Sequence, residues 1–200
     1  MSRLVETIRT EDGQLLNIGF HNERLIRSLN DVFGFKTEIN LKKLVTVPEA
    51  ANKGIFKCRI EYDREIGKIE FLPYTVKPVR SLKLVEDNDI DYRYKFIDRS
   101  AIDRLMDRRA ECDDIIIVKN GYLTDSSYAN LVFLNRSGEW VTPSTYLLPG
   151  TRRASLLLAG LITETLISFS DLENYIEVKL INAMIGIEDT VGIPIGNLLI

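Results

Sequence analysis

The stretch NGYLTDSSYANLVFL (residues 120–134) combines a turn signal, two short apolar segments and a cluster of small polar side chains. Asn120-Gly121 between apolar runs is typical of a tight hairpin, so the stretch predicts two antiparallel strands. A turn needs only one or two polar residues, yet Asp125 and Asn130 both lie just before the run LVFL. A carboxylate carried toward a core normally meets a partner, and we expect one for Asp125. The alternative is an Asx-type turn, in which Asp125 bonds neighbouring backbone N–H groups.

The segments on either side predict further strands and helices. Apolar and polar residues alternate over residues 55–63 and 68–76, which predicts an antiparallel pair. Apolar residues at helical spacing predict helices over residues 21–34 and 151–164. Further strands are expected over residues 3–10, 15–20, 79–86, 113–125, 131–143 and 173–186, and further helices over 40–52 and 100–112.

This order of elements predicts an α+β fold with mainly antiparallel sheets flanked by helices. The composition changes near residue 88, where the polar and aromatic stretch DNDIDYRYKFIDRS begins. We therefore expect two lobes, a small N-terminal α+β lobe of residues 1–86 and a larger C-terminal lobe of residues 87–200 that binds the ligand.

The composition excludes several classes of function. A net charge of −3 gives no electrostatic reason to expect nucleic acid as a partner. No apolar run reaches membrane-spanning length, and the N-terminus lacks the apolar core of a secretory signal. Two separated cysteines fit a reduced cytoplasm, and with His21 as the single histidine a zinc site is not expected. Chemistry would then come from lysine, carboxylates or a cofactor.

Two further segments carry candidate chemistry. Lys95 lies between two aromatic residues, where it is either a surface lysine or a desolvated amine able to form a Schiff base. Gly150-Thr151 precedes the helix predicted over 151–164, and free N–H groups at a helix start favour an anion such as phosphate. Arg152 and Arg153 add positive charge, which a bound phosphate would balance; a turn with two solvated arginines is the alternative.

Taken together, these features suggest one ligand. A lysine suits an aldehyde, a helix start suits a phosphate, and a buried carboxylate suits a ring nitrogen. Pyridoxal 5′-phosphate has all three groups, and a carboxylate that keeps its pyridine nitrogen protonated strengthens its action as an electron sink. The partner expected for Asp125 would then be the pyridinium.

Five segments, in the same order, resemble the class IV (fold type IV) pyridoxal-phosphate enzymes, which include branched-chain and D-amino-acid aminotransferases and aminodeoxychorismate lyase. The segments are VETIRTEDGQLLNIGFHNERLIRS (5–28), KFIDR (95–99), NGYLTDSSYANLVF (120–133), VTPSTYLLPGTRRASLL (141–157) and LINAMIGI (180–187). The resemblance implies the two-lobed fold of D-amino-acid aminotransferase, with the cofactor between the lobes and a second subunit completing the active site. We therefore expect a cytoplasmic homodimer.

The resemblance also implies a role for each matching residue. Lys95 would bind the cofactor covalently and transfer protons, and Arg24 would reach its phosphate. Asp125 takes the position of the pyridine-nitrogen carboxylate, as a residue one methylene shorter than the usual glutamate. The remaining cofactor-binding positions are Thr151, Arg152, Asn182 and Ala183.

The pair Asn182-Ala183 is most similar to the lyase branch, whereas aminotransferases more often have Gly-Thr there. The expected reaction is therefore that of 4-amino-4-deoxychorismate lyase, which releases pyruvate and forms 4-aminobenzoate, a folate precursor. The alternatives are a branched-chain or D-amino-acid aminotransferase, or a non-catalytic relative that binds the cofactor. The chain resembles a shortened member of the family, with Gly67 in place of a longer glycine-rich loop.

Overall fold

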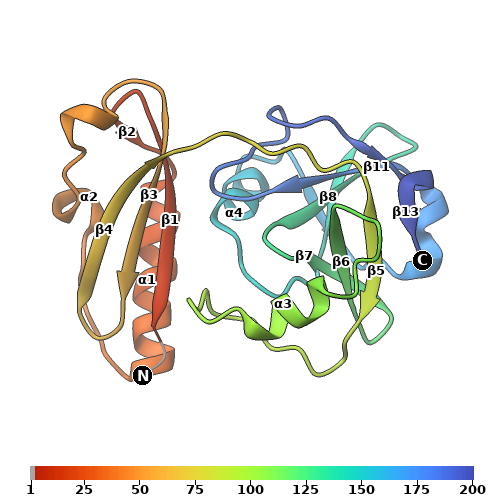
Figure 1. Cartoon of the computed structure of the whole chain (residues 1–200), viewed down its shortest axis with the longest axis horizontal. Coiled ribbons are helices and arrows are strands. Elements are labelled where there is room, and N and C mark those ends of the chain that lie inside the picture. The colour runs from red at the N-terminus through yellow and green to blue at the C-terminus, as the bar shows by residue number, and fades with distance from the viewer. Residues whose placement is uncertain (1–2) are drawn as a thin grey trace. The chain divides into compact units, whose positions relative to one another are not determined.

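The computed structural model describes residues 3–200 of the chain, which divide into two compact units (Figure 1). The first unit consists of the chain up to Thr75 together with Tyr94–Asp98. The second consists of Val76–Arg93 and Arg99–Ile200. The lobes predicted from the sequence, residues 1–86 and 87–200, divide at a different place. The reason is that the strand β5 (Leu82–Glu86) pairs with β6 (Asp114–Lys119) of the second unit.

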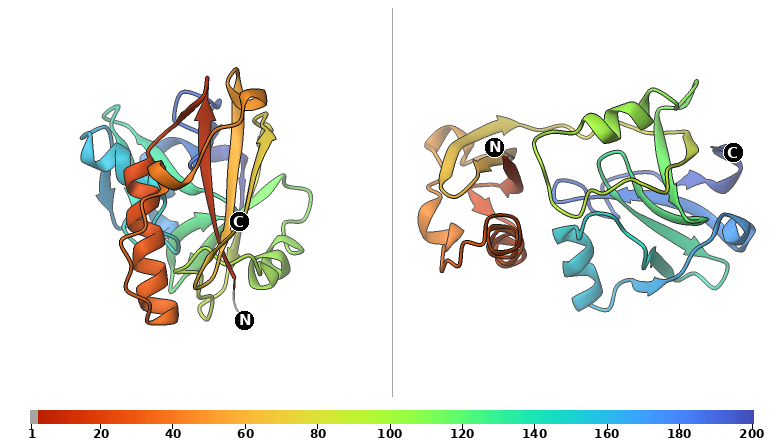
Figure 2. Two further views of the ribbon diagram at one scale, coloured as in Figure 1. Left: turned by 90° about the vertical axis from the view of Figure 1, so that its left-hand side faces the viewer. Right: turned by 90° about the horizontal axis from the view of Figure 1, so that it is seen from below.

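The first unit is a four-stranded antiparallel sheet with a long helix packed on one face (Figure 1, Figure 2). The strand order is β2-β1-β3-β4, and the strands are β1 (Leu4–Glu11), β2 (Gln14–Leu15), β3 (Ile55–Tyr62) and β4 (Ile66–Pro73). The helix α1 (Ile18–Phe33) buries Leu25 and Leu29 against Ile8 and Ile60 of the sheet. The antiparallel pair predicted over residues 55–63 and 68–76 is present as β3 and β4.

Two predictions for this unit were wrong in extent. The strand expected over residues 15–20 ends at Leu15, because Asn17 adopts a left-handed conformation with a φ of 54° and the helix α1 begins directly after it. The helix expected over residues 40–52 is reduced to α2 (Leu41–Leu44) and the 3-10 turn η1 (Glu49–Ala51). Pro48 directly precedes that turn, and a proline in a helix interior interrupts the helix.

The second unit is built on a nine-stranded mixed sheet. Most of its pairs are antiparallel, but β5 pairs in parallel with β6 and with β13, and β10 pairs in parallel with β9. The hairpin predicted around Asn120-Gly121 joins β6 to β7, and both turn residues have positive φ. The other strands are β7 (Tyr122–Ser126), β8 (Asn130–Asn135), β9 (Trp140–Pro143), β10 (Thr163–Thr165), β11 (Tyr175–Ile181), β12 (Ile193–Pro194) and β13 (Leu198–Leu199).

Alternation along β8 divides its side chains between two clusters. Leu131 and Phe133 belong to the main core of the unit. Val132 belongs to a smaller cluster with Ile181 of β11 and Leu156 of the helix α4 (Thr151–Leu158). Since residues two apart share a face of a strand, Asn130 lies on the same face as Val132. The polar residue that begins β8 is therefore on the side of the sheet that α4 covers.

The helices of this unit are shorter than predicted. The helix expected over residues 100–112 is α3 (Ser100–Met106), and that expected over 151–164 ends at Leu158. Gly160, with a φ of 67°, follows α4, and the chain then enters β10. Two short 3-10 segments, η2 (Phe169–Asn174) and η3 (Ile195–Asn197), complete the unit. No helix within residues 3–200 is both long and apolar enough to cross a membrane.

Candidate functional site

The first unit contains a buried cluster of ionisable side chains. The strand β1 places Glu6 beneath α1, and that helix places His21 and Arg24 three residues apart on the face turned toward it. Arg24 donates two hydrogen bonds to the carboxylate, from Nε to Oε1 at 2.9 Å and from Nη2 to Oε2 at 2.6 Å. His21 Nδ1 lies 2.6 Å from Oε2 of the same carboxylate. This bidentate geometry fixes the plane of the Arg24 guanidinium.

Burial and charge act in opposite directions on this cluster. Burial raises the pKa of Glu6, but the charge of Arg24 and the hydrogen bonds from His21 and Arg24 outweigh it and lower the pKa to about 2. Burial also lowers the pKa of His21 below its usual value, despite the hydrogen bond to Glu6. At neutral pH, His21 is therefore uncharged, and its Nδ1–H faces Glu6.

Lys95 lies in the same unit as Arg24. Its backbone carbonyl accepts a hydrogen bond of 2.9 Å from the N–H of Val5, and Phe96 forms a β-bridge with Leu4. The positive charge of Lys95 also contributes to the lowered pKa of His21. The candidate lysine is thus held against the start of β1, directly beside the strand position of Glu6. No role was assigned to Glu6 from the sequence, and a glutamate at an inward position of a predicted strand was the signal that could have revealed it.

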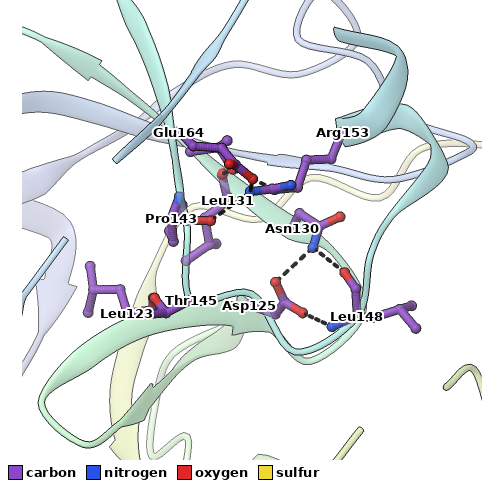
Figure 3. A network of polar contacts seen from close by, with 10 residues as sticks. Leu123, Asp125, Asn130, Leu131, Pro143, Thr145, Leu148, Arg153 and Glu164 are labelled. Atoms are coloured by element: carbon purple, nitrogen blue, oxygen red, sulfur yellow. Dashed lines mark hydrogen bonds and ion pairs between the residues drawn. The ribbon is translucent and has the colours of Figure 1, made fainter. Parts of the chain in front are cut away.

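The second unit buries the carboxylate of Asp125 at the end of β7 (Figure 3). Its Oδ1 accepts a hydrogen bond of 2.8 Å from Asn130 Nδ2. Its Oδ2 accepts hydrogen bonds from the backbone N–H groups of Leu147 and Leu148, at 3.1 and 2.9 Å. Asp125 thus has three hydrogen-bond partners within the chain, while the pyridinium expected as its partner stays a prediction. The alternative of an Asx-type turn is wrong, because these N–H groups lie more than twenty residues away in sequence.

The pKa of Asp125 moves in the opposite direction from that of Glu6. Burial raises it to about 6. The hydrogen bonds from Leu148, Asn130 and Leu147 and the more distant charge of Arg153 lower it, but they do not compensate for burial. Amide dipoles solvate a buried carboxylate less effectively than a guanidinium in direct contact.

Thr151 and Arg152 form the first turn of α4. Gly150 precedes the helix and provides no side-chain cap, and no acidic residue occupies the first turn. Thr151 is buried, and Arg152 Nε is buried without a hydrogen-bond partner among the residues that the structure describes. The start of α4 therefore has a positive charge and, within the described residues, one unpartnered side-chain donor, Arg152 Nε, with no acidic residue in its first turn.

Arg153 does not add to that charge. It is buried, and its Nη2 donates to Glu164 at 2.5 Å and to the carbonyl of Pro143 at 2.9 Å, while its guanidinium stacks on Tyr146. The expectation that both arginines are solvated or face an anion was thus wrong for Arg153, which ties α4 to the strands beside it.

Asn182 and Ala183 follow the last residue of β11. Ile181 is paired with Asn130 in the β11–β8 ladder, so the Asn182-Ala183 pair leaves the sheet next to the start of β8. Asn182 Oδ1 accepts a hydrogen bond of 2.8 Å from the N–H of Met184, which fixes a tight turn there. Five of the residues predicted for the site thus lie in the second unit, around Asn130: Asp125, Thr151, Arg152, Asn182 and Ala183.

Comparison with known proteins identifies the family. The family described as amino-transferase class IV matches residues 3–189. An uncharacterized protein of Haemophilus influenzae is 40% identical over 190 residues, which are 94% of this chain and 100% of that protein. A crystal structure from Haemophilus somnus 129pt, provisionally assigned as a 4-amino-4-deoxychorismate lyase, is 37% identical with a TM-score of 0.86, covering 94% of this chain and 98% of that one.

A more distant structure has the same fold. A hypothetical aminotransferase from Mycobacterium tuberculosis, solved in its PLP-bound form, is 16% identical with a TM-score of 0.75 over 98% of this chain and 81% of its own. The predicted α+β fold of the fold type IV enzymes is therefore confirmed. The chain belongs to the amino-transferase class IV family of pyridoxal-phosphate-dependent enzymes.

Proposed function

We propose that this protein is a 4-amino-4-deoxychorismate lyase, which uses pyridoxal phosphate to release pyruvate and form 4-aminobenzoate. The observation that carries the proposal is the 37% identity to the Haemophilus somnus protein, over nearly the full length of both chains. The pair Asn182-Ala183, at the end of β11, agrees with the same branch of the family.

The residues of the second unit fit the chemistry of this cofactor. The start of α4 offers backbone N–H groups and the unpartnered Nε of Arg152 to a phosphate. Asp125 has a pKa of about 6, and Oδ1 receives one of its three hydrogen bonds. A carboxylate oxygen can accept two hydrogen bonds, so Oδ1 has capacity for one more donor, such as a ring N–H.

Each residue has a defined part in the proposed reaction. Pyridoxal phosphate, when bound, supplies an electron sink for the carbanion formed at the substrate. Lys95 Nζ would hold the cofactor covalently, accept the proton removed from the substrate, and return a proton to the departing pyruvate fragment. Arg24, Thr151 and Arg152 would bind the phosphate, with the Arg24 guanidinium held in plane by Glu6. Asn182 and Ala183 would complete the binding site.

An assay of the lyase reaction tests this proposal directly. Purified protein with added pyridoxal phosphate is given 4-amino-4-deoxychorismate, and pyruvate and 4-aminobenzoate are measured separately. We expect the two products in equal amounts, and no product from Lys95→Ala. Lys68→Ala, whose side chain is 64% exposed on β4, is the matched control and retains the wild-type rate. Transfer of an amino group to 2-oxoglutarate without pyruvate release would instead assign an aminotransferase.

The proposal extends to assembly and location. We propose a homodimer in the cytoplasm, supported by the family resemblance and by the two cysteines, which are both unpaired. Sedimentation of the purified protein at micromolar concentration tests the first point, and a monomer with full activity would contradict it.

A further inference from the structure

We propose that Asn130 is a positioning residue that fixes the first turn of α4 relative to Asp125. The group that binds the phosphate and the group that faces the ring are thereby held at a fixed distance from each other. This inference rests on the proposed function, because it concerns the same cofactor site. It assigns Asn130 no contact with the reacting atoms.

Asn130 and Asp125 together clamp Leu148, the first through its carbonyl and the second through its N–H (Figure 3). Asp125 Oδ2 accepts the N–H groups of Leu147 and Leu148, and Asn130 Nδ2 donates 2.9 Å to the carbonyl of Leu148. The same Nδ2 donates 2.8 Å to Asp125 Oδ1. Because both neighbours are acceptors, only the NH2 end of the amide can face them, which fixes the orientation of the side chain.

The other end of the Asn130 amide is used as well. Its Oδ1 packs against Gly150, and a Cβ placed on Gly150 would overlap that oxygen. Gly150 directly precedes Thr151, the first residue of α4. The side chain of Asn130 therefore contacts two residues just before the helix begins, Leu148 through one hydrogen bond and Gly150 through packing.

The β-sheet places the other proposed cofactor-binding segments of the second unit next to Asn130. Asn130 is paired with Asp125 of β7 and with Ile181 of β11. Asn182 and Ala183 follow Ile181 in sequence, so the start of β8 is where the three proposed parts of the cofactor site meet. A shift of the Asn130 side chain would move the first turn of α4 relative to both strands.

A direct test uses the apo protein and inorganic phosphate. Amide NMR spectra of wild type, Asn130→Ala and Asn135→Ala are recorded during a phosphate titration. Asn135 is the matched control, because it lies at the other end of β8 and its side chain bonds to Ser137 and Glu139 of the adjacent turn. We expect phosphate to shift the Thr151 and Arg152 amides of wild type and Asn135→Ala, and to bind Asn130→Ala at least tenfold more weakly.

A second titration compares pyridoxal phosphate with pyridoxal, which lacks the phosphate. The ratio of the affinity for pyridoxal phosphate to the affinity for pyridoxal should be at least tenfold lower in Asn130→Ala than in wild type. The same ratio should be unchanged in Asn135→Ala. If Asn130→Ala does not fold, Asn130→Ser, which retains a short donor, is measured instead. We expect its preference for the phosphorylated form to be lower than that of wild type.

Each of the following three outcomes would overturn the inference. Wild-type phosphate affinity in Asn130→Ala would show that the clamp does not position α4. Equal weakening of pyridoxal and pyridoxal phosphate would show only a general loss of structure. Thr151 and Arg152 amides that do not respond to phosphate in wild type would remove the anion site at α4. None of these results depends on pyruvate release, so the lyase assignment can stand or fall separately.

Discussion

Glu6 in the first unit and Asp125 in the second are both buried carboxylates, yet their pKa values move in opposite directions. Glu6 is 0% exposed and its pKa falls to about 2, whereas Asp125 is 5% exposed and its pKa rises to about 6. Burial raises the pKa of both. The difference therefore lies in the partners that each carboxylate meets.

Glu6 meets a full positive charge at hydrogen-bond distance in a bidentate geometry. Asp125 meets only neutral donors, and the nearest cation that affects it, Arg153, is itself paired with Glu164. The comparison shows that Glu6 is suited to be a permanent anchor for Arg24. A pKa of about 6 leaves Asp125 mostly ionised at neutral pH, so it can accept a hydrogen bond from a further N–H donor.

The largest effect is expected from Glu6→Gln. This change leaves the buried Arg24 without its counter-charge, which typically costs about 3–5 kcal/mol in the free energy of unfolding. Urea denaturation of the apo protein measures it. The double variant Glu6→Gln/Arg24→Gln should recover part of the loss, because it removes the unpaired charge. A loss below about 1 kcal/mol would mean that Arg24 finds another partner and that Glu6 is no anchor.

The pH dependence of stability should separate the two carboxylates. The pKa of Glu6 is lowered from 4.5 to about 2, so its contribution is complete above pH 4.5 and is lost as the pH falls toward 2. The pKa of Asp125 is raised from 3.8 to about 6, so its contribution is complete below pH 3.8 and is lost as the pH rises through 6. Each pKa unit corresponds to about 1.4 kcal/mol.

Denaturation of wild type and the single variants across pH 2–8 measures both windows. The difference in the free energy of unfolding between wild type and Glu6→Gln should become smaller as the pH falls. The corresponding difference between wild type and Asp125→Asn should change mainly between pH 4 and 6. Parallel stability curves for wild type and Asp125→Asn would contradict the raised pKa of Asp125.

A smaller effect is expected from Asp125→Asn at neutral pH. Three donors converge on this carboxylate, and an amide must turn its NH2 group toward at least one of them. Two donors that face each other leave a hydrogen bond unmade, which lowers the free energy of unfolding by about 1–3 kcal/mol. The loss is partly offset because the variant no longer buries a charge. We expect this variant to bind pyridoxal phosphate but to turn over slowly, as measured by absorbance titration and pyruvate release. An unchanged rate would remove Asp125 from the ring-nitrogen role.

Much of the fold was predictable because its signals are local. Alternating residues predicted β3 and β4, and Asn120-Gly121 predicted the hairpin between β6 and β7. The parallel strand β10 was not predicted, because its pairing with β9 depends on packing between segments about twenty residues apart. The start of α1 was misplaced because one residue, Asn17, ends the strand by adopting a left-handed conformation.

The site was predictable to a different degree in each unit. The inward position of Asp125 followed from its place between a turn and an apolar run, but its bonds to Leu147 and Leu148 depend on how a distant loop packs. The role of Glu6 was missed because a single glutamate in a strand is more often solvated, and only the helix above it supplies Arg24 and His21. Long-range packing, rather than residue type, determines which carboxylates are buried and which partners they meet.

The smallest effect is expected from Glu11→Gln, which tests whether burial or pairing determines the strength of the Glu6 anchor. Glu11 lies on the same strand and accepts a hydrogen bond from Arg9 Nε at 3.1 Å, but its side chain is 40% exposed. Because water solvates the Glu11 carboxylate, we expect the pair to contribute about 0–1 kcal/mol, although the side chain of Arg9 is only 9% exposed. Urea denaturation should therefore place Glu11→Gln within about 1 kcal/mol of wild type. A loss as large as that of Glu6→Gln would mean that pairing along β1 stabilises the strand wherever it occurs, and the distinction drawn between buried and exposed carboxylates would not hold.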